Sequence, residues 1–134
     1  MPKKKKTPPK RLGEYSEVCF MARALKHRFS ISKPYGDSDT YDFIVDSRHG
    51  RLSRIQVRST ATLHNYCYSV DIRQSHRPPT PDHADFIAAY VVPCDTFYIV
   101  PIAFVTGRTH LWLAPHRPSK STTEPFREAW HMLR

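Results

Sequence analysis

One short stretch of the chain holds three side chains whose types could do chemistry together. Asp42 lies in a run of aromatic and β-branched residues, and Gln56 and Arg58 lie in the next alternating run. Carboxylate and amide oxygens are hard ligands of the kind that Mg²⁺ takes in proteins. A guanidinium donates hydrogen bonds to anionic oxygens and always keeps its charge. These types suit a site for a cation and an anion, provided that the fold brings the three side chains together.

A β-hairpin is the element that would bring them together. Residues 41–46 and 51–58 are predicted as strands, because they are rich in aromatic and β-branched residues or alternate in character. The four residues between them end in a glycine and supply a tight turn. With a three-residue loop, Asp42 faces Gln56, and Arg58 lies on the same face. A bulge would shift this register, and a plain cross-strand ion pair between Asp42 and Arg58 is the structural alternative.

A helix is predicted before the hairpin, over residues 13–28. Its apolar residues recur at helical spacing and form a stripe that we expect to face the core, made of Val18, Met21, Ala22, Leu25 and Phe29. Glu17 lies at the edge of this stripe, where a carboxylate can reach toward a site beside the sheet. The alternative is an ordinary surface acid in the first turn, which the helix dipole favours. Residue types alone favour this alternative.

Further apolar and alternating runs predict the rest of a sheet. Strands are expected at residues 29–32, 66–73, 86–92, 97–105 and 110–113. Three prolines make residues 74–83 a loop. A second helix is predicted over residues 124–133, because one face would hold Phe126, Ala129, Trp130 and Leu133. The order of elements indicates an α/β or α+β fold, with a β-sheet flanked by an N-terminal and a C-terminal helix.

The order of the polar residues resembles a known motif. An Asp, about a dozen residues and then Asp/Glu-x-Lys on the next strand form the catalytic hairpin of the PD-(D/E)XK nucleases. Here Asp42 and Gln56-Val57-Arg58 stand at those positions. Gly13-Glu14-Tyr15-Ser16-Glu17 resembles the GxxxE helix start of Holliday-junction resolvases and their relatives. A bacterial PD-(D/E)XK endonuclease family, whose relatives include an intron-homing endonuclease, is similar in the segments 32–38, 84–90, 97–101 and 127–130.

This resemblance implies a restriction-endonuclease-like core with a central mixed sheet over residues 12–134. It implies that Glu17, Asp42 and Gln56 ligate Mg²⁺ or Mn²⁺ and that Arg58 is the catalytic cation beside them. Gln56 replaces an acid, so we expect weaker metal affinity than in an all-acid site. Arg58 replaces a lysine and cannot act as a base.

The expected function is therefore that of a metal-dependent DNA endonuclease. The alternative is a nuclease-fold protein that binds DNA and cleaves it weakly or not at all. The resemblance also implies a homo-oligomer, either a dimer or a tetramer.

The charge balance favours a polyanionic partner. The 134-residue chain has a formal net charge of +9, which points to nucleic acid first and an anionic membrane second. Residues 1–11 form a basic, proline-containing segment that we expect to be a disordered tail outside the domain. The candidate DNA-contacting residues are Lys3, Lys4, Lys5, Lys6, Lys33, Ser59 and Thr60.

Several other classes of protein are disfavoured by the composition. No apolar run is long enough to cross a membrane, and the basic start leads into no signal peptide. The three cysteines are far apart in sequence, which predicts free thiols in a reducing cytoplasm. The eight histidines show no zinc-ligand spacing. No Ser-His-Asp arrangement or phosphate-cradling glycine loop stands out.

Overall fold

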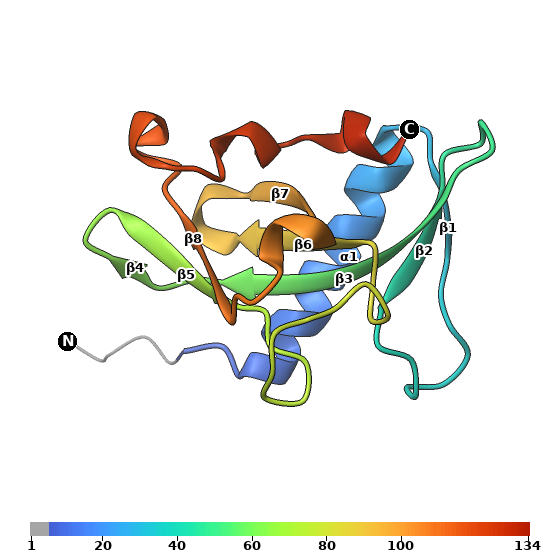
Figure 1. The fold of residues 1–134 in the computed structure, drawn as a ribbon, viewed down its shortest axis with the longest axis horizontal. Coiled ribbons are helices and arrows are strands. Elements are labelled where there is room, and N and C mark those ends of the chain that lie inside the picture. Colours follow the sequence, from blue (N-terminus) through green and yellow to red (C-terminus); the bar gives the residue numbers. More distant parts are fainter. Residues whose placement is uncertain (1–5) are drawn as a thin grey trace.

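The computed structural model describes residues 6–134 of the chain (Figure 1). The helix α1 spans Pro9–Lys26. The strands are β1 (Ser30–Ser32), β2 (Phe43–Asp46), β3 (Leu52–Thr60), β4 (Leu63–His64), β5 (Cys67–Asp71), β6 (Phe86–Val91), β7 (Thr96–Pro101) and β8 (His110–Leu113). Short 3₁₀ helices follow later in the chain: η1 (Val92–Cys94), η2 (Ile102–Val105), η3 (Pro118–Lys120), η4 (Glu124–Phe126) and η5 (Trp130–Leu133).

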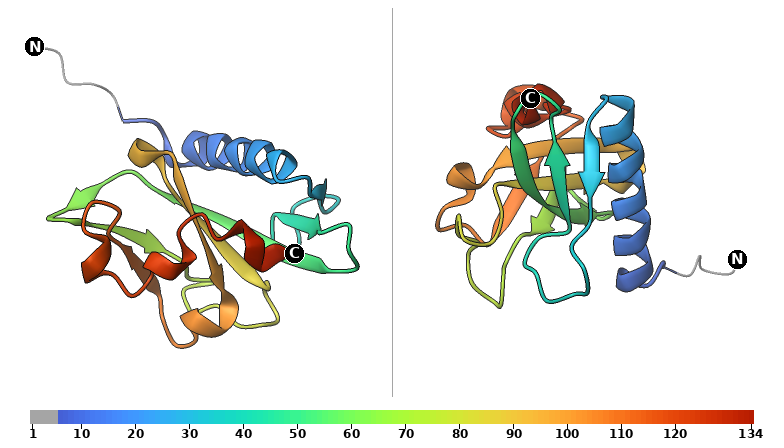
Figure 2. Two further views of the ribbon diagram at one scale, coloured as in Figure 1. Left: turned by 90° about the horizontal axis from the view of Figure 1, so that it is seen from above. Right: turned by 90° about the vertical axis from the view of Figure 1, so that its right-hand side faces the viewer.

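The strands form two sheets. The larger has five strands in the order β1-β2-β3-β6-β7, and the smaller has three in the order β4-β5-β8. Strand β3 pairs with β6 in parallel, whereas the other paired strands of both sheets are antiparallel. The helix lies along one face of the larger sheet, as the two views of Figure 2 show. The predicted mixed sheet with an N-terminal helix is thus confirmed.

The central hairpin has the predicted register. Phe43 pairs with Ile55 and Asp46 with Leu52, and the Ser47 N–H donates to the Arg51 carbonyl at 2.9 Å. Arg48 and Gly50 in the turn have φ of 64° and 97°, so the turn uses the left-handed conformations that glycine favours. The same register places Asp42 beside Gln56, where the ladder ends.

A hydrophobic core fills the space between α1 and the larger sheet. Phe20 is fully buried there, with its ring 5.5 Å from Phe43 and 5.4 Å from Trp130. A second core lies on the other face of β6 and β7, where the small sheet contributes Tyr68, Val70, Leu111 and Leu113. Strands β6 and β7 are consequently buried on both faces, as their continuous apolar sequences predict.

The predicted apolar stripe of α1 is only partly correct, because Phe29 is buried and Met21 packs against the core while Ala22 is exposed. The helix buries Ser16, Phe20 and Ala24, whereas Val18 and Leu25 are 57% and 60% exposed. A hydroxyl can be buried here because the Ser16 Oγ donates to the Leu12 carbonyl at 2.8 Å. The helix also begins at Pro9, so the last residues of the predicted tail are helical. Proline fits the first turn of a helix because its missing N–H needs no partner there.

The predicted C-terminal helix is also wrong, although its apolar residues are buried. Residues 124–133 form η4 and η5, separated by Glu128 in a left-handed conformation with φ of 49°. The Glu128 N–H donates to the Phe97 carbonyl at 2.7 Å, and its carboxylate accepts from the Phe97 N–H at 3.0 Å and the Trp130 indole at 2.6 Å. These bonds tie the segment to the free edge of β7 and replace the bonds of a helix.

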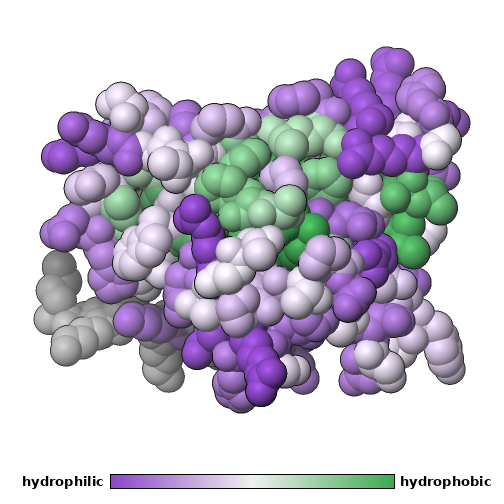
Figure 3. Space-filling view, in the orientation of Figure 1, coloured by the Kyte–Doolittle hydropathy of each residue, from purple (hydrophilic) through white to green (hydrophobic). Residues whose placement is uncertain are grey.

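The strand predicted at residues 66–73 belongs to the smaller sheet. Its alternation is as expected, because Tyr68, Val70 and Ile72 are buried and Ser69 and Asp71 face outward. On the face shown in Figure 3, hydrophobic residues gather over β7 and η2 and hydrophilic residues surround them. In the part of the chain that the structure describes, no helix is both long and apolar enough to cross a membrane.

Candidate active site

Two acids and a lysine from different elements meet at the open edge of the hairpin. Glu17 comes from α1, Lys33 from the loop after β1, and Asp42 from the start of the hairpin. They line one hollow of about 250 Å³. The Lys33 Nζ lies 3.2 Å from the Glu17 Oε1 and 5.2 Å from the centroid of the Phe43 ring. The lysine therefore holds the helix carboxylate beside the hairpin.

Asp42 is half-buried and tied to the β3 backbone. Its Oδ2 accepts a 2.7 Å hydrogen bond from the Val57 N–H. Burial raises the pKa of the Asp42 carboxyl, the Val57 N–H lowers it, and the Glu17 carboxylate raises it further. The Arg58 and Lys33 cations lower the same pKa. Asp42 thus responds to charges from α1, from the loop after β1 and from β3, which makes it the centre of the candidate site.

Gln56 and Arg58 project from β3 toward the segment after β5. The Gln56 Nε2 donates to the Gln74 Oε1 at 3.0 Å, and the Arg58 Nη2 donates to the Arg73 carbonyl at 2.9 Å. Two consecutive residues therefore hold the two side chains that depart from the family motif. Neither side chain lines the hollow of Glu17 and Asp42, so among the described residues the expected four-residue group lies in two adjoining parts.

A tight turn fixes the residues that hold Gln56 and Arg58. Gln74 and Arg77 exchange backbone hydrogen bonds of 2.8 and 3.1 Å. Ser75 and His76 between them have φ of 50° and 67°, the pattern of a type I′ turn that Asn-Gly adopts most easily. Such conformations cost free energy in residues with a side chain, and that kind of strain gathers at functional sites. Residues 74–77 are called the clamp turn below.

Two buried polar atoms in this region have no protein partner. These are the Gln56 Oε1 and the Arg58 Nε, one an acceptor and the other a donor. Unpartnered buried polar atoms are rare and costly, so each calls for a partner that the chain itself does not supply. A cation would satisfy the amide oxygen, and an anionic oxygen would satisfy the guanidinium. An amide oxygen and carboxylates are hard ligands of the types that Mg²⁺ or Mn²⁺ takes, and a guanidinium N–H is a donor that a phosphate oxygen can accept.

The described residues contain no metal site built from protein ligands alone. Within residues 6–134, no three His, Cys, Asp or Glu side chains lie close enough to hold a metal ion. Two carboxylates with one amide leave several coordination positions to water and substrate, which is the arrangement that Mg²⁺ commonly adopts.

The comparisons with known proteins identify the family and the fold. A model of the PD-(D/E)XK endonuclease family matches residues 7–133. The chain belongs to this family. Among solved structures it is similar to a bacterial homing endonuclease, I-Ssp6803I, with 29% sequence identity and a TM-score of 0.80 over 95% of this chain and 91% of the other. A search of curated proteins found no match. The family and the nuclease fold predicted from the sequence are therefore confirmed.

The candidate DNA-contacting residues of this PD-(D/E)XK protein are spread over two places. Lys33 lines the hollow of Glu17 and Asp42. Lys6, Ser59 and Thr60 line a second hollow, of about 590 Å³, at the far end of β3. Lys3, Lys4 and Lys5 lie outside the described residues.

Arg73 and Gln74 were missed as members of the site. The sequence placed Arg73 at the end of a strand and Gln74 in a proline-containing loop. No local pattern predicts that the two contact β3, since the 15 residues from Arg58 to Arg73 and the 18 from Gln56 to Gln74 separate the partners. An amide directly after an alternating strand was the one available signal.

Proposed function

We propose that this protein is a metal-dependent DNA endonuclease. The observation that carries the proposal is that Glu17 and Asp42 line one hollow beside β3, the strand from which Gln56 and Arg58 project. The family match supports a nuclease fold over most of the chain, and the charge of +9 supports a nucleic acid as the substrate.

The metal would be held by the carboxylates of Glu17 and Asp42 and by the amide oxygen of Gln56. A divalent cation bound there supplies Lewis-acid stabilisation of the phosphoryl oxygens and a water of lowered pKa. The Val57 N–H keeps the Asp42 carboxylate turned toward β3, and Lys33 keeps the Glu17 carboxylate near it. The chain thus orients two charged ligands before the substrate arrives, which limits the reorganisation needed for reaction.

Arg58 keeps the positive charge of the motif lysine but cannot accept a proton. Its unpartnered Nε–H is available to a phosphoryl oxygen once the substrate is bound. Lys33 also lines the hollow of Glu17 and Asp42, and its ammonium group donates to the Glu17 carboxylate. We therefore assign charge stabilisation to Arg58 and the orientation of Glu17 and the attacking water to Lys33.

A comparison of two neighbouring glutamates tests this proposal. Glu17→Gln should lower the rate of plasmid nicking in Mg²⁺ at least 100-fold. Loss of one group that stabilises a transition state typically costs about 3 kcal/mol, which corresponds to such a factor. Glu17→Gln should also weaken Mn²⁺ binding measured by calorimetry. Glu14→Gln removes an exposed acid on the same helix and should change neither. Equal losses in both variants, or no Mn²⁺ binding by the wild type at millimolar concentration, would contradict the proposal.

A nuclease-fold protein that binds DNA without cleavage remains the competing function. The replacement of both motif residues, the acid by Gln56 and the lysine by Arg58, is the observation that favours it. In that case the wild type shows no nicking in Mg²⁺ or Mn²⁺ and still binds plasmid DNA.

A further inference from the structure

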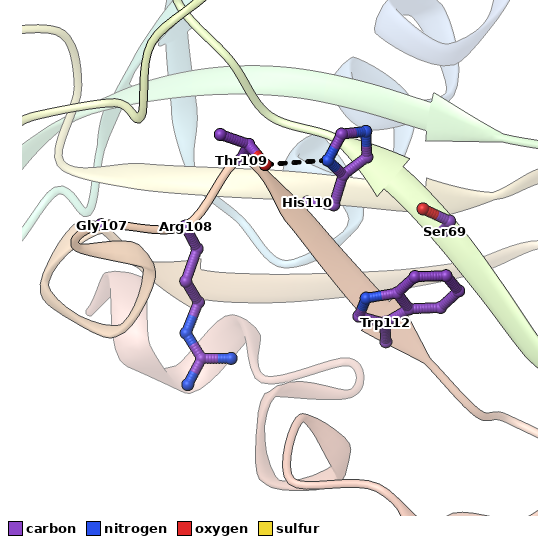
Figure 4. A pocket seen from close by; sticks show the side chains of 6 residues that line it. All are labelled: Ser69, Gly107, Arg108, Thr109, His110 and Trp112. Atoms are coloured by element: carbon purple, nitrogen blue, oxygen red, sulfur yellow. Dashed lines mark hydrogen bonds between the residues drawn. The ribbon is translucent and has the colours of Figure 1, made fainter.

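The outward face of the small sheet carries an exposed tryptophan at the edge of a hollow. Trp112 on β8 is 57% exposed, whereas the other tryptophan of the chain, Trp130, is 1% exposed. The hollow has a volume of about 500 Å³ (Figure 4) and is lined by Ser69, Gly107, Arg108, Thr109, His110 and Trp112. A large flat ring at the edge of a hollow offers a surface on which a planar ligand can stack.

The groups around Trp112 suit a nucleotide. Ser69 pairs with Trp112 across the strands, and its hydroxyl lies on the same face as the indole. The His110 Nδ1 lies 3.0 Å from the Thr109 Oγ1, which fixes the imidazole beside them. The Arg108 guanidinium lies 4.7 Å from the centroid of the Phe104 ring, and this contact holds the cation at the rim. The face therefore combines a stacking surface, hydrogen-bonding groups and a positive charge.

The hollow beside Trp112 and the one at the end of β3 have one lining residue in common. Ser69 lines both, and the second hollow adds Lys6, Ser59, Thr60 and His64. Hydroxyls and cations thus follow one path across the small sheet from Arg108 to Lys6. Such a path matches a polyanion that crosses the surface and not a compact neutral ligand.

The path also reaches the candidate active site. Asp71 pairs with His110 across the strands, the Arg73 Nη2 lies 2.7 Å from the Asp71 carboxylate, and the Arg73 carbonyl accepts from Arg58. Four residues separate Ser69 from Arg73, or about 13 Å of extended chain at roughly 3.3 Å per residue. An unpaired DNA strand of a few nucleotides is long enough to span that distance.

We propose that Trp112 stacks on an unpaired nucleobase of single-stranded DNA, and that Arg108 and Lys6 contact the phosphates on either side. The inference rests on the proposed function in one respect, which is that the polyanion is DNA. It places a binding surface for unpaired DNA on the small sheet, outside the residues assigned to cleavage. A second copy of the chain on this face would be the other use of an exposed tryptophan, and the experiment distinguishes it.

Intrinsic fluorescence tests the proposal directly, because Trp130 is buried and the signal that responds to ligand comes from Trp112. An oligothymidylate of about 12 nucleotides, in buffer without divalent metal, should quench the emission of the full-length protein. Affinity is measured by fluorescence anisotropy with the same oligonucleotide carrying a dye. Trp112→Leu should weaken binding roughly tenfold or more. Trp112→Phe keeps a stacking ring and should bind with an affinity close to that of the wild type. Arg108→Ala should flatten the salt dependence of binding.

Oligonucleotide binding without quenching, or equal affinity of Trp112→Leu and the wild type, would overturn the proposal. A change of oligomeric state in Trp112→Leu, measured by sedimentation, would also overturn it, because this face would then be a contact between copies of the chain. Asp42→Asn separates the two proposals, since it should abolish plasmid nicking and leave quenching intact. Quenching by a protein that never nicks DNA would refute the endonuclease and support the site at Trp112.

Discussion

Arg58 and Lys33 are the two cations whose charges act on Asp42 in the candidate site, and they come from different elements, β3 and the loop after β1. Both lower the pKa of the Asp42 carboxyl. Arginine offers a fixed charge and a planar set of donors, whereas lysine offers a charge that can shift with its surroundings. The division of tasks proposed above would account for an arginine at the position where the family motif has lysine.

Substitution of these cations should separate the two tasks. Arg58→Lys should keep plasmid nicking within a few-fold of the wild type, because the charge remains, and Arg58→Ala should lower it about 100-fold or more. Lys33→Met should lower nicking and weaken Mn²⁺ binding, because Glu17 loses its ion pair. Lys120→Ala removes an exposed charge elsewhere and serves as the control. If Arg58→Ala nicks as fast as Lys120→Ala, Arg58 is a solvated sheet cation and no part of the site.

Burial of the Asp42 carboxyl carries a stability cost when the group is ionised. Its pKa is raised chiefly by burial, so the unfolded chain gives up this proton at lower pH than the folded protein does. Stability is therefore lost as pH rises from the ordinary value of 3.8 through the folded pKa. A charged group retained at such a position is typical of a site that needs the charge.

Asp42→Asn should accordingly stabilise the protein at neutral pH while it abolishes Mn²⁺ binding. The amide oxygen can still accept the Val57 N–H, and the buried charge is gone. We expect a rise of about 3–5 °C in the unfolding midpoint at neutral pH, on the order of 1 kcal/mol for a domain of this size, and no difference below the ordinary pKa of the carboxyl. Thermal unfolding monitored by circular dichroism at both pH values measures this, and a lower midpoint at neutral pH would contradict it.

At the scale of elements, the clamp turn is the part of the fold that joins the small sheet to the candidate site. Its left-handed Ser75 and His76 hold Gln74 against Gln56, and this contact leaves the Gln56 Oε1 free of protein partners. Residues that orient a ligand through a hydrogen bond commonly matter for metal affinity almost as much as the ligand does.

Gln74→Leu should therefore weaken Mn²⁺ binding by about tenfold or more, because the amide of Gln56 is released. The double change Ser75→Asn with His76→Gly is the matched control, since Asn-Gly suits this turn and should raise stability without loss of metal affinity. Calorimetric titration of both proteins makes the comparison. Unchanged affinity in Gln74→Leu would remove the clamp turn from the site.

The helix α1 supplies a second element-scale test, because its buried face differs from its apolar stripe. Phe20→Ala should cost about 3–5 kcal/mol, as expected for a fully buried aromatic side chain among other rings. Val18→Ala removes an exposed side chain and should cost less than about 0.5 kcal/mol. Urea unfolding measures both. Equal costs would mean that the helix packs through its Val18 face instead.

At the scale of the whole molecule, the formal net charge of +9 is the property that most favours a polyanionic partner such as DNA. Each lysine or arginine that neutralises a phosphate releases counterions, so affinity falls steeply as salt rises. The acidic partners that the structure gives to several arginines, such as Asp85 for Arg54 and Asp71 for Arg73, reduce the number that remain available.

The four lysines at positions 3–6 should contribute directly to this salt dependence. Their replacement by glutamine should lower duplex affinity and reduce the slope of log K against log salt by about 0.9 for each lysine that contacts a phosphate. The helix begins at Pro9, so the fold should be unaffected. Anisotropy titrations over a range of salt concentrations give the slope, and Lys120→Gln gives the effect of a single surface charge. An unchanged slope would show that this segment does not reach the DNA.

The sequence by itself determined the central hairpin and the family. Turn residues, alternation and register are local properties, so the order of residues along the chain is enough to place Asp42 beside Gln56 and Arg58. The continuous apolar strands β6 and β7 were equally evident, because burial on both faces leaves one unbroken pattern. The motif positions followed from the order of a few residues along neighbouring strands.

Only the tertiary structure decided which face of α1 is buried and what the last residues form. Ser16 can be buried because its hydroxyl donates a hydrogen bond to a carbonyl of its own helix. Residues 124–133 do not form one α-helix, because the Glu128 N–H bonds instead to the Phe97 carbonyl at the edge of β7. The partners of Gln56 and Arg58 also come from residues far along the chain. Such contacts depend on how sheets and loops pack. Local sequence patterns relate only residues that are close along the chain, so they do not predict these contacts.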